Sequence, residues 1–243
     1  MNGRSAIRRL PVGILHRQDS GRTAIELFLR GERMARALKI YQELFDFDAE
    51  VRTHFPVFCG VDEAGRGPLA GDVYAAAVIL PPDLVIPGLN DSKKLSEARR
   101  EELAVEVKKH AAAFCIAHAT VGEIERLNIL QAALLAMHRA VEGLEIQPEF
   151  VLADGNQPPV VPVPVGTVVH GDAKSASIAA ASVLAKTARD AALRELDALY
   201  PEYGFAAHKG YGTKAHYAAL EQYGPCPAHR PSFLKKFYER GGR

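Results

Sequence analysis

The chain has 243 residues, of which 48% are hydrophobic and 24% charged, as in folded soluble proteins. This composition argues against fibrous and disordered classes, and no apolar run reaches the roughly 20 residues that cross a bilayer. The first residues lack the apolar core of a signal peptide, so we expect a cytoplasmic protein without membrane contacts. The three cysteines have no CxxC spacing, which argues against a disulfide framework or a thiolate zinc site.

The net charge of +1 hides an uneven distribution. Residues 1–53 carry ten Lys and Arg against seven Asp and Glu, residues 54–207 carry thirteen against twenty, and residues 208–243 carry seven against two. An acidic middle between basic ends fits an enzyme that binds a polyanion and holds metal ions with carboxylates. Solvated faces that differ in charge explain the same counts equally well.

The first 53 residues are rich in arginine and lack strand-like runs, and we interpret them as a partly helical extension. Apolar side chains at helical spacing predict a helix within residues 32–51, packed on the main body. From residue 54 onward, strand-like runs alternate with helical patterns. The expected strands are residues 55–62, 72–80, 113–121, 150–154 and 165–171, and the expected helices are residues 96–111, 128–144 and 175–201. The alternation predicts one α/β domain over residues 54–243, with a central mixed β-sheet flanked by helices and a basic, helical C-terminal part.

The most informative motif is GVDEAGRGP, which contains Asp62 and Glu63. These two carboxylates stand where an apolar strand gives way to a glycine-rich turn. Burying two adjacent carboxylates without partners is costly, and a hard cation would remove that cost. Taken alone, the motif is better explained as a tight turn with an acidic pair facing solvent.

The turn after the two acids has features of its own. Gly65 and Gly67 leave the backbone N–H groups uncovered, and Arg66 between them supplies a positive charge. Such a turn is suited to hold a phosphate or a sugar hydroxyl beside the carboxylates.

Two further aspartates occupy similar positions. Asp154 ends the predicted strand FVLAD, and Asp172 lies between the last predicted strand and a Ser- and Ala-rich helix. Ligand sites of α/β proteins form at the carboxyl edge of the sheet, so both are expected to converge there with Asp62 and Glu63. For Asp154 alone, a turn residue is an equal explanation. Carboxylates without matching Cys or His favour Mg²⁺ or Mn²⁺, and a pair of such ions commonly serves in-line phosphodiester cleavage.

From residue 58 to residue 237 the chain resembles the bacterial ribonuclease HII family, the type 2 ribonucleases H. The motifs that carry this resemblance are, in order, GVDEAGRGPLAG, NDSKKLS, IERLNILQAALLAMHRAV, LADGN, GDAKSASIAAASVLAKTARD, HKGYGTKAHYAAL and GPCPAHRPSF. The resemblance implies a ribonuclease H-like catalytic domain, in which the family's four acidic residues correspond to Asp62, Glu63, Asp154 and Asp172.

The resemblance also implies an activity. An enzyme of this kind hydrolyses the RNA strand of RNA–DNA hybrids and nicks duplex DNA at embedded ribonucleotides by a two-metal-ion reaction with Mg²⁺ or Mn²⁺, leaving 3′-hydroxyl and 5′-phosphate ends. The family's recognition turn corresponds to Gly65, Arg66 and Gly67, and its tyrosine to Tyr211. These residues read the sugar at the junction, where the 2′-hydroxyl distinguishes RNA from DNA. One departure is Asp72, which replaces the family's usual proline and which we interpret as a strand-edge surface residue.

Further polar and basic residues are candidates for contacts with the substrate. Ser92 and Lys93 lie in a loop before a helix, where they are suited to hold backbone phosphates. In the basic C-terminal region we favour Lys209 and Arg230 as substrate contacts over the neighbouring histidines.

Two other functions stay open. One is a hybrid-binding protein without activity, against which the presence of all four acids counts. The other is a type 3-like ribonuclease H that needs longer RNA tracts, against which the Gly-Arg-Gly turn and Tyr211 count. We expect a monomer whose partners are RNA–DNA hybrids and duplex DNA that contains ribonucleotides.

Overall fold

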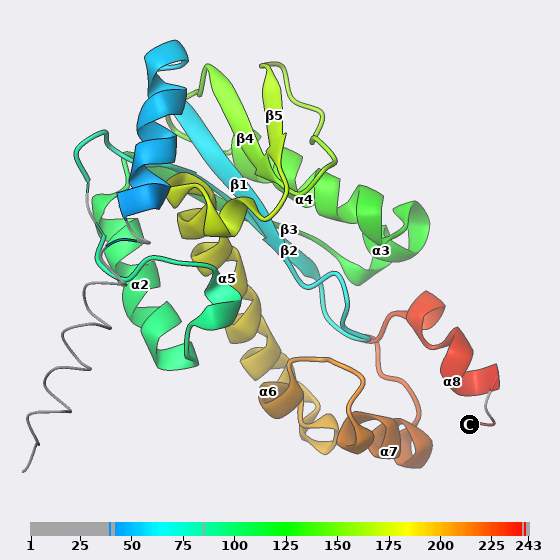
Figure 1. Cartoon of the computed structure of the whole chain (residues 1–243). Coiled ribbons are helices and arrows are strands. Elements are labelled where there is room, and N and C mark those ends of the chain that lie inside the picture. Colours follow the sequence, from blue (N-terminus) through cyan, green and yellow to red (C-terminus); the bar gives the residue numbers. More distant parts are fainter. Residues whose placement is uncertain (1–38, 40–41, 85, 240, 242–243) are drawn as a thin grey trace, which may run out of the picture. The chain divides into compact units, whose positions relative to one another are not determined.

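A five-stranded mixed sheet forms the centre of the fold (Figure 1). In spatial order its strands are β3 (Ala113–Ala119), β2 (Val73–Ile79), β1 (Phe58–Ala64), β4 (Phe150–Asp154) and β5 (Val165–Val168). The central strand β1 pairs antiparallel with β2 and parallel with β4. The computed structural model describes residues 39, 42–84, 86–239 and 241.

Helices cover both faces of the sheet. The long helices are α2 (Glu97–His110), α4 (Ile129–Glu142) and α5 (Ala176–Leu199), and the short α3 (Val121–Leu127) leads into α4. The apolar side chains of α4 pack against one face, whereas those of α2 and α5 form a core with the other. In Figure 1, α5 crosses the sheet with α2 beside it. The expected α/β fold with a mixed sheet between helices is therefore confirmed.

Helix α5 lies unusually close to β1, and a glycine makes this possible. A Cβ atom at Gly60 would lie 2.2 Å from the carbonyl carbon of Ser177, in the first turn of α5. Because such a contact is impossible for real atoms, no residue with a side chain fits at this point without moving the helix. The start of α5 is thereby fixed against the strand that carries the first two candidate acids.

Two expected strands end earlier than the sequence predicted. The strand expected over residues 113–121 stops at Ala119, because Thr120 caps α3 instead. Its hydroxyl accepts the N–H of Glu123, while the Glu123 carboxylate accepts the N–H of Thr120. The strand expected over residues 165–171 stops at Val168, and the chain then forms the short 3₁₀ helix η2 (Gly171–Ala173).

The chain after α5 forms a separate helical layer. The elements of this layer are η3 (Pro201–Tyr203), α6 (Phe205–His208), α7 (Lys214–Tyr223), η4 (Pro231–Phe233) and α8 (Lys235–Glu239). One further 3₁₀ helix, η1 (Ser92–Lys94), lies elsewhere, on the loop before α2. These elements share a core with the end of α5, centred on Leu193 and Phe205. A bridge between Ala70 and His229 joins this layer to the loop that follows β1. Among the described helices, none is long and apolar enough to cross a membrane.

The helix expected near the start of the chain is present where the structure describes it. Residues 42–54 are helical, and Leu44 is buried in the core shared with α2 and α5. The remainder of the expected extension, residues 1–38, 40 and 41, lies outside the described residues.

Candidate active site

The four candidate acids come from three elements that meet at the carboxyl edge of the sheet. Asp62 and Glu63 lie near the end of β1, Asp154 is the last residue of β4, and Asp172 lies in η2. The parallel register of β1 and β4 aligns the residues just before Asp62 and Asp154, so these two acids occupy neighbouring positions. The fold thus places the residues that the strand-end pattern singled out on elements that meet at one edge of the sheet.

Backbone hydrogen bonds position two of these carboxylates. The N–H of Gly171 donates to Oδ1 of Asp154 at 2.6 Å, which ties η2 to the end of β4. The N–H of Glu63 donates to Oδ1 of Asp62 at 2.7 Å. Asp62 and Asp172 are both buried, so their carboxylates have little contact with water.

The carboxylates are buried close enough to repel one another. Burial, and then the negative charges of Glu63 and Asp154, raise the pKa of Asp62 well above its usual range. Burial also raises the pKa of Glu63 and that of Asp172, although Arg66 and Lys93 respectively oppose the increase. Carboxylates held together in this way favour any cation that enters among them.

Lys93 supplies one such cation. Its ammonium nitrogen lies 3.6 Å from Oδ2 of Asp172, although the side chain is 78% exposed. Burial lowers its pKa, but the charges of Asp172 and Asp62 outweigh that effect and raise it overall. The ammonium therefore offsets part of the negative charge of the acids.

The same acids fit a hard divalent ion by their chemistry. All four donors are carboxylates, the ligands that suit Mg²⁺ and Mn²⁺. Among the residues that the structure describes, no three or more His, Cys, Asp or Glu side chains form a ready-made metal site. Binding an ion would thus require side-chain movements, and the exposed ammonium of Lys93 is free to move away from Asp172.

Ser92 has a different position from the expected phosphate contact. It is buried, and its hydroxyl lies 2.7 Å from that of Ser182 on α5, which in turn hydrogen-bonds to Asp62. Arg100 holds the loop by donating to the carbonyl oxygens of Ser92 at 3.1 Å and Leu95 at 2.6 Å. Ser92 therefore supports Asp62 indirectly, through the hydroxyl of Ser182.

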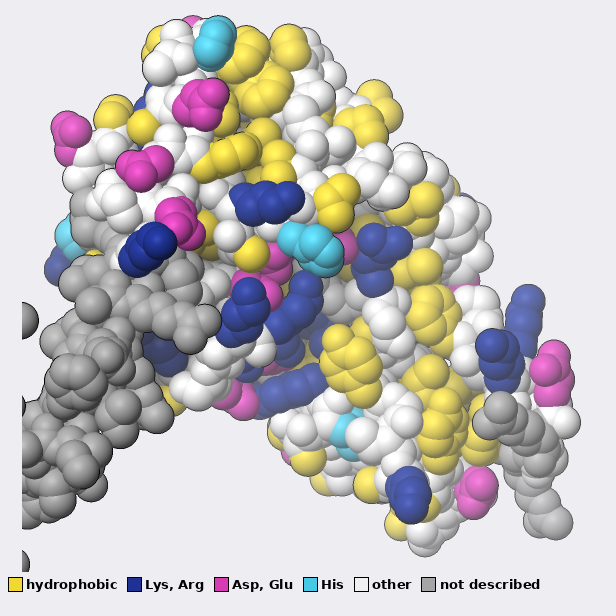
Figure 2. All heavy atoms as spheres, in the orientation of Figure 1, with side chains coloured by type: hydrophobic (Ala, Val, Ile, Leu, Met, Phe, Trp, Pro, Cys, Tyr) yellow, Lys and Arg dark blue, Asp and Glu magenta, His cyan; other side chains and the backbone are white. Residues whose placement is uncertain are grey.

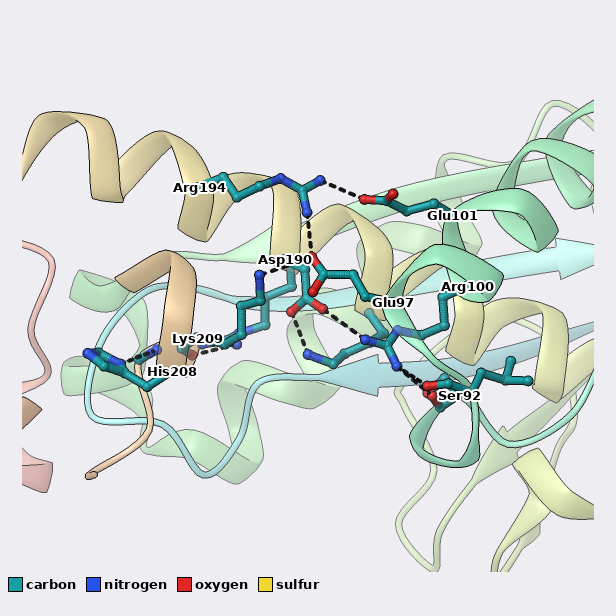
Figure 3. Close-up of polar contacts among 12 residues, drawn as sticks. Ser92, Glu97, Arg100, Glu101, Asp190, Arg194, His208 and Lys209 are labelled. Carbon is teal, nitrogen blue, oxygen red and sulfur yellow. Dashed lines mark hydrogen bonds and ion pairs between the residues drawn. The ribbon is translucent and has the colours of Figure 1, made fainter. Parts of the chain in front are cut away.

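Behind this loop lies a network of ion pairs (Figure 3). Arg100 pairs with the buried Asp190 at 3.5 Å, and Lys186 pairs with the same carboxylate. Lys209, for which a substrate contact was expected, pairs with Glu97 at 3.1 Å. Glu97 also receives a hydrogen bond from Arg194, so the Lys209 ammonium lies within a network that joins α2, α5 and the loop after α6.

Arg230 also differs from its expected role. Its guanidinium is fully buried and cannot reach a ligand at the surface. It donates instead to four carbonyl oxygens of the loop after β1, at 2.6–3.1 Å, namely those of Gly65, Arg66, Pro68 and Gly71. The expectation of a direct contact with nucleic acid is thus replaced by a role in holding this loop.

Arg189, which sequence reasoning missed, assists Arg230. It is buried on α5 and donates to the carbonyl oxygens of Ala70 and Lys209 at 3.2 and 3.1 Å. A Cβ atom at Gly65 would lie 2.1 Å from its Nε, and Gly65 has a φ of +104°, so only glycine fits there. In the sequence Arg189 stands beside Lys186 and Asp190 on the predicted helix, so no local signal set it apart as a buried residue.

The Gly-Arg-Gly turn connects the acids with Tyr211. Arg66 lies 3.4 Å from Glu63 in an ion pair, and a Cβ atom at Gly67 would lie 3.6 Å from the ring of Tyr211. The tyrosine ring is 48% exposed beside the turn. Figure 2 shows Lys and Arg side chains gathered around acidic side chains near the middle of one face, a charge pattern suited to a phosphodiester chain.

Asp72 forms polar contacts with Val121 and His118 at one end of the sheet. One carboxylate oxygen accepts the N–H of Val121 at 2.9 Å, at the first residue of α3, and the other lies 3.7 Å from His118. Its replacement of the family's usual proline therefore provides a hydrogen bond to the start of a helix.

The fold defines the class of protein. The crystal structure of the ribonuclease H2 from Pyrococcus horikoshii OT3 matches with a TM-score of 0.63 and 26% identity, covering 75% of this chain and 97% of that one. The structure of Bst-RNase HIII in complex with Mn²⁺ matches with a TM-score of 0.56 and 16% identity, covering 69% and 63% of the two chains, and supports the fold alone. The protein is a ribonuclease H-like α/β nuclease.

The sequence places it more narrowly. The family model of ribonuclease HII matches residues 59–237. Ribonuclease HII of Laribacter hongkongensis is 62% identical over 177 residues, which are 72% of this chain and 89% of that relative. The chain therefore belongs to the ribonuclease HII family and is an endonuclease of the type 2 ribonuclease H class, as the resemblance implied.

Proposed function

We propose that this nuclease hydrolyses the RNA strand of RNA–DNA hybrids and nicks duplex DNA at embedded ribonucleotides, leaving 3′-hydroxyl and 5′-phosphate ends. The observation that carries the proposal is the contact between two features. The acids at the sheet edge adjoin the Gly-Arg-Gly turn through the Arg66–Glu63 ion pair, and Tyr211 lies against the same turn. A scissile phosphate and the neighbouring ribose could thus be bound together.

Each group has a defined part in this proposal. Asp62, Glu63, Asp154 and Asp172 would hold Mg²⁺ or Mn²⁺, which when bound activates water and stabilises the leaving oxygen of a phosphodiester.

Recognition falls to the neighbouring turn. The carbonyl oxygens of Gly65 and Arg66 bind Arg230, which fixes the orientation of the peptide groups around them. The turn offers its remaining polar groups to the 2′-hydroxyl, and the exposed ring of Tyr211 packs on the adjoining sugar. Lys93 faces the acids and is placed to contact a phosphate.

The partners proposed are RNA–DNA hybrids and duplex DNA that contains ribonucleotides, bound by a monomer in the cytoplasm. Residues 54–243 would form the catalytic domain and residues 1–53 an extension to it. Ser92, Lys209 and Arg230 enter the proposal through the loops and ion pairs that they hold, since their polar groups are engaged within the protein.

The test is a duplex with one embedded ribonucleotide, assayed beside a continuous RNA–DNA hybrid with Mg²⁺, with Mn²⁺ and with EDTA. We expect both substrates to be cut with either metal and neither with EDTA. A hybrid that is cut beside an intact single-ribonucleotide duplex would favour the type 3-like alternative. Binding of both substrates without cleavage under any metal would favour the hybrid-binding protein, and cleavage in EDTA would overturn the role of metals.

A further inference from the structure

The buried carboxylate of Asp48 lies outside the segment that matches the family, yet it contacts the catalytic domain at a sensitive point. Asp48 belongs to the helical segment 42–54, whereas the family match begins at residue 59. Its side chain is fully buried. Oδ1 accepts a hydrogen bond from the hydroxyl of Ser175 at 2.6 Å, and Oδ2 accepts two from Ser177, at 2.8 Å from the N–H and 2.6 Å from the hydroxyl.

Those two serines form the start of α5. Ser175 is the N-cap residue, and its hydroxyl accepts the N–H of Ile178 while it donates to Asp48. A carboxylate at this end of a helix is favoured by the helix dipole, and it satisfies N–H groups that the helix itself leaves unpaired. Asp48 therefore binds both the N-cap residue and the first turn of α5.

The first turn of α5 is joined to three of the four acids. Asp172 lies three residues before Ser175, whose N–H donates to the carbonyl oxygen of Gly171 at 2.8 Å. The N–H of Gly171 in turn binds Asp154. On its other side, the backbone of Ser177 lies against Gly60, two residues before Asp62 on β1. A shift of this turn would therefore be transmitted to each of these acids.

We propose that Asp48 is a positioning residue for the metal site, acting from the extension through Ser175 and Ser177 on the elements that carry Asp62, Asp154 and Asp172. This inference rests on the proposed metal-binding role of those acids. Groups that orient metal ligands typically change metal affinity by about 10- to 100-fold when they are removed. Asp48 touches neither the substrate nor the metal, so its loss should weaken metal binding more than it slows the loaded enzyme.

The experiment measures binding of Mn²⁺ alone to the full chain, from the electron paramagnetic resonance signal of free Mn²⁺. For Asp48→Ala we expect the Kd to rise about tenfold. Asp48→Asn should show a smaller rise, because an amide oxygen still accepts from Ser177. In cleavage assays the Mn²⁺ concentration for half-maximal rate should rise in parallel, while the rate at saturating Mn²⁺ stays near that of the wild type.

Leu44→Ala is the matched control. Leu44 lies on the same helical segment and is equally buried, but it contributes only apolar contacts. Its truncation should destabilise the chain by about 2–5 kcal/mol and leave the Kd for Mn²⁺ unchanged. If Asp48→Ala does not fold, Ser177→Ala, which removes one hydrogen bond to Asp48, is measured in its place and should raise the Kd by a smaller factor.

The outcomes separate the inference from the proposed function. If the wild type binds Mn²⁺ and the Asp48 or Ser177 variant binds it equally well, the positioning role is overturned. The same conclusion follows if Leu44→Ala weakens binding as much as Asp48→Ala does, because the effect would then reflect stability alone. Wild-type protein that neither binds Mn²⁺ nor cleaves would overturn the proposed function itself.

Discussion

The candidate site has two sides, which the fold holds in different ways. On the carboxylate side, the fold keeps negatively charged groups close together although they repel one another; these groups are Asp62, Glu63, Asp154 and Asp172. Burial and mutual repulsion raise the pKa of Asp62 well above its usual range, so this side gains from a proton or from an added cation. The turn side, comprising residues 65–71 and Tyr211, is held by neutral carbonyl groups around the buried Arg230. One side would therefore be stabilised by an added cation, whereas the other is organised by hydrogen bonds within the protein.

The turn side also depends on neutral histidines. The N–H of Cys226 donates to Nδ1 of His229 at 2.9 Å, which leaves the proton of that ring on Nε2. His229 Nε2 lies 3.0 Å from Nε2 of His216, whose Nδ1 then donates to the carbonyl oxygen of Tyr211 at 2.9 Å. A proton on either ring would break this chain. Acid should thus relieve the carboxylate side and strain the turn side.

The largest effect is expected from removing one charge on the carboxylate side. Asp62→Asn should lower cleavage by at least about 10³-fold, or roughly 4 kcal/mol of transition-state stabilisation, because a ligand central to the proposed metal site is lost. Binding of an RNA–DNA hybrid should persist, since the turn side is intact. Single-turnover cleavage and a binding titration at low metal measure the two quantities, and near-normal cleavage by the variant would contradict the assignment.

The next effect tests the turn side. Arg230→Gln leaves several buried carbonyl groups without donors, and we expect a loss of roughly 3 kcal/mol in the free energy of unfolding. Cleavage at a single embedded ribonucleotide should fall about tenfold relative to cleavage of a long hybrid, because the turn is displaced. Urea unfolding and the ratio of the two cleavage rates provide the measurement.

Arg100→Gln is the counterpart on the carboxylate side. It also removes hydrogen bonds to carbonyl groups, those of Ser92 and Leu95. The ratio between the two substrates should stay constant in this variant. An equal change of that ratio in both variants would mean that the two sides are not separable.

The smallest effect is the pH dependence of the histidines. Burial, and then the neighbouring His208 and His229, lower the pKa of His216 to about 4, against 6.5 for the free side chain. The unfolded chain therefore takes up the proton first, and stability is lost as the pH falls from about 6.5 to about 4, by on the order of 2 kcal/mol.

The acids respond with the opposite sign, since burial raises their pKa values in the fold. The useful measure is therefore the difference in unfolding free energy between His216→Asn and the wild type at each pH. This difference should shrink from pH 7 to pH 4.5. A constant difference over that range would show that His216 does not titrate as its environment requires.

The placement of the acids near strand ends was predictable because its signal is local. A carboxylate at the end of an apolar strand is visible in a few residues, and parallel strands place such ends at one edge, as Asp62 and Asp154 illustrate. The same reasoning predicted the mixed sheet and the helices that flank it.

The roles of the buried charges were not predictable in this way. Arg230 and Lys209 look like surface cations in the sequence, and the groups that neutralise them come from distant segments. The partners of Arg230 lie on a turn more than 150 residues earlier, and that of Lys209 lies on α2. Asp48 is a similar case, because its partners Ser175 and Ser177 lie 127 and 129 residues later in the chain.

The hydrogen bond between Arg230 and the carbonyl of Gly65 spans 165 residues of sequence. A contact of such long range forms only after both segments have been synthesised and the loop between them has closed. A nascent chain that has emerged from the ribosome as far as Asp172 would already contain every acidic residue of the site, but its turn would still lack the arginine that shapes it. On the proposed role of the turn, the ability to tell ribose from deoxyribose would then mature only after all four acids have been synthesised.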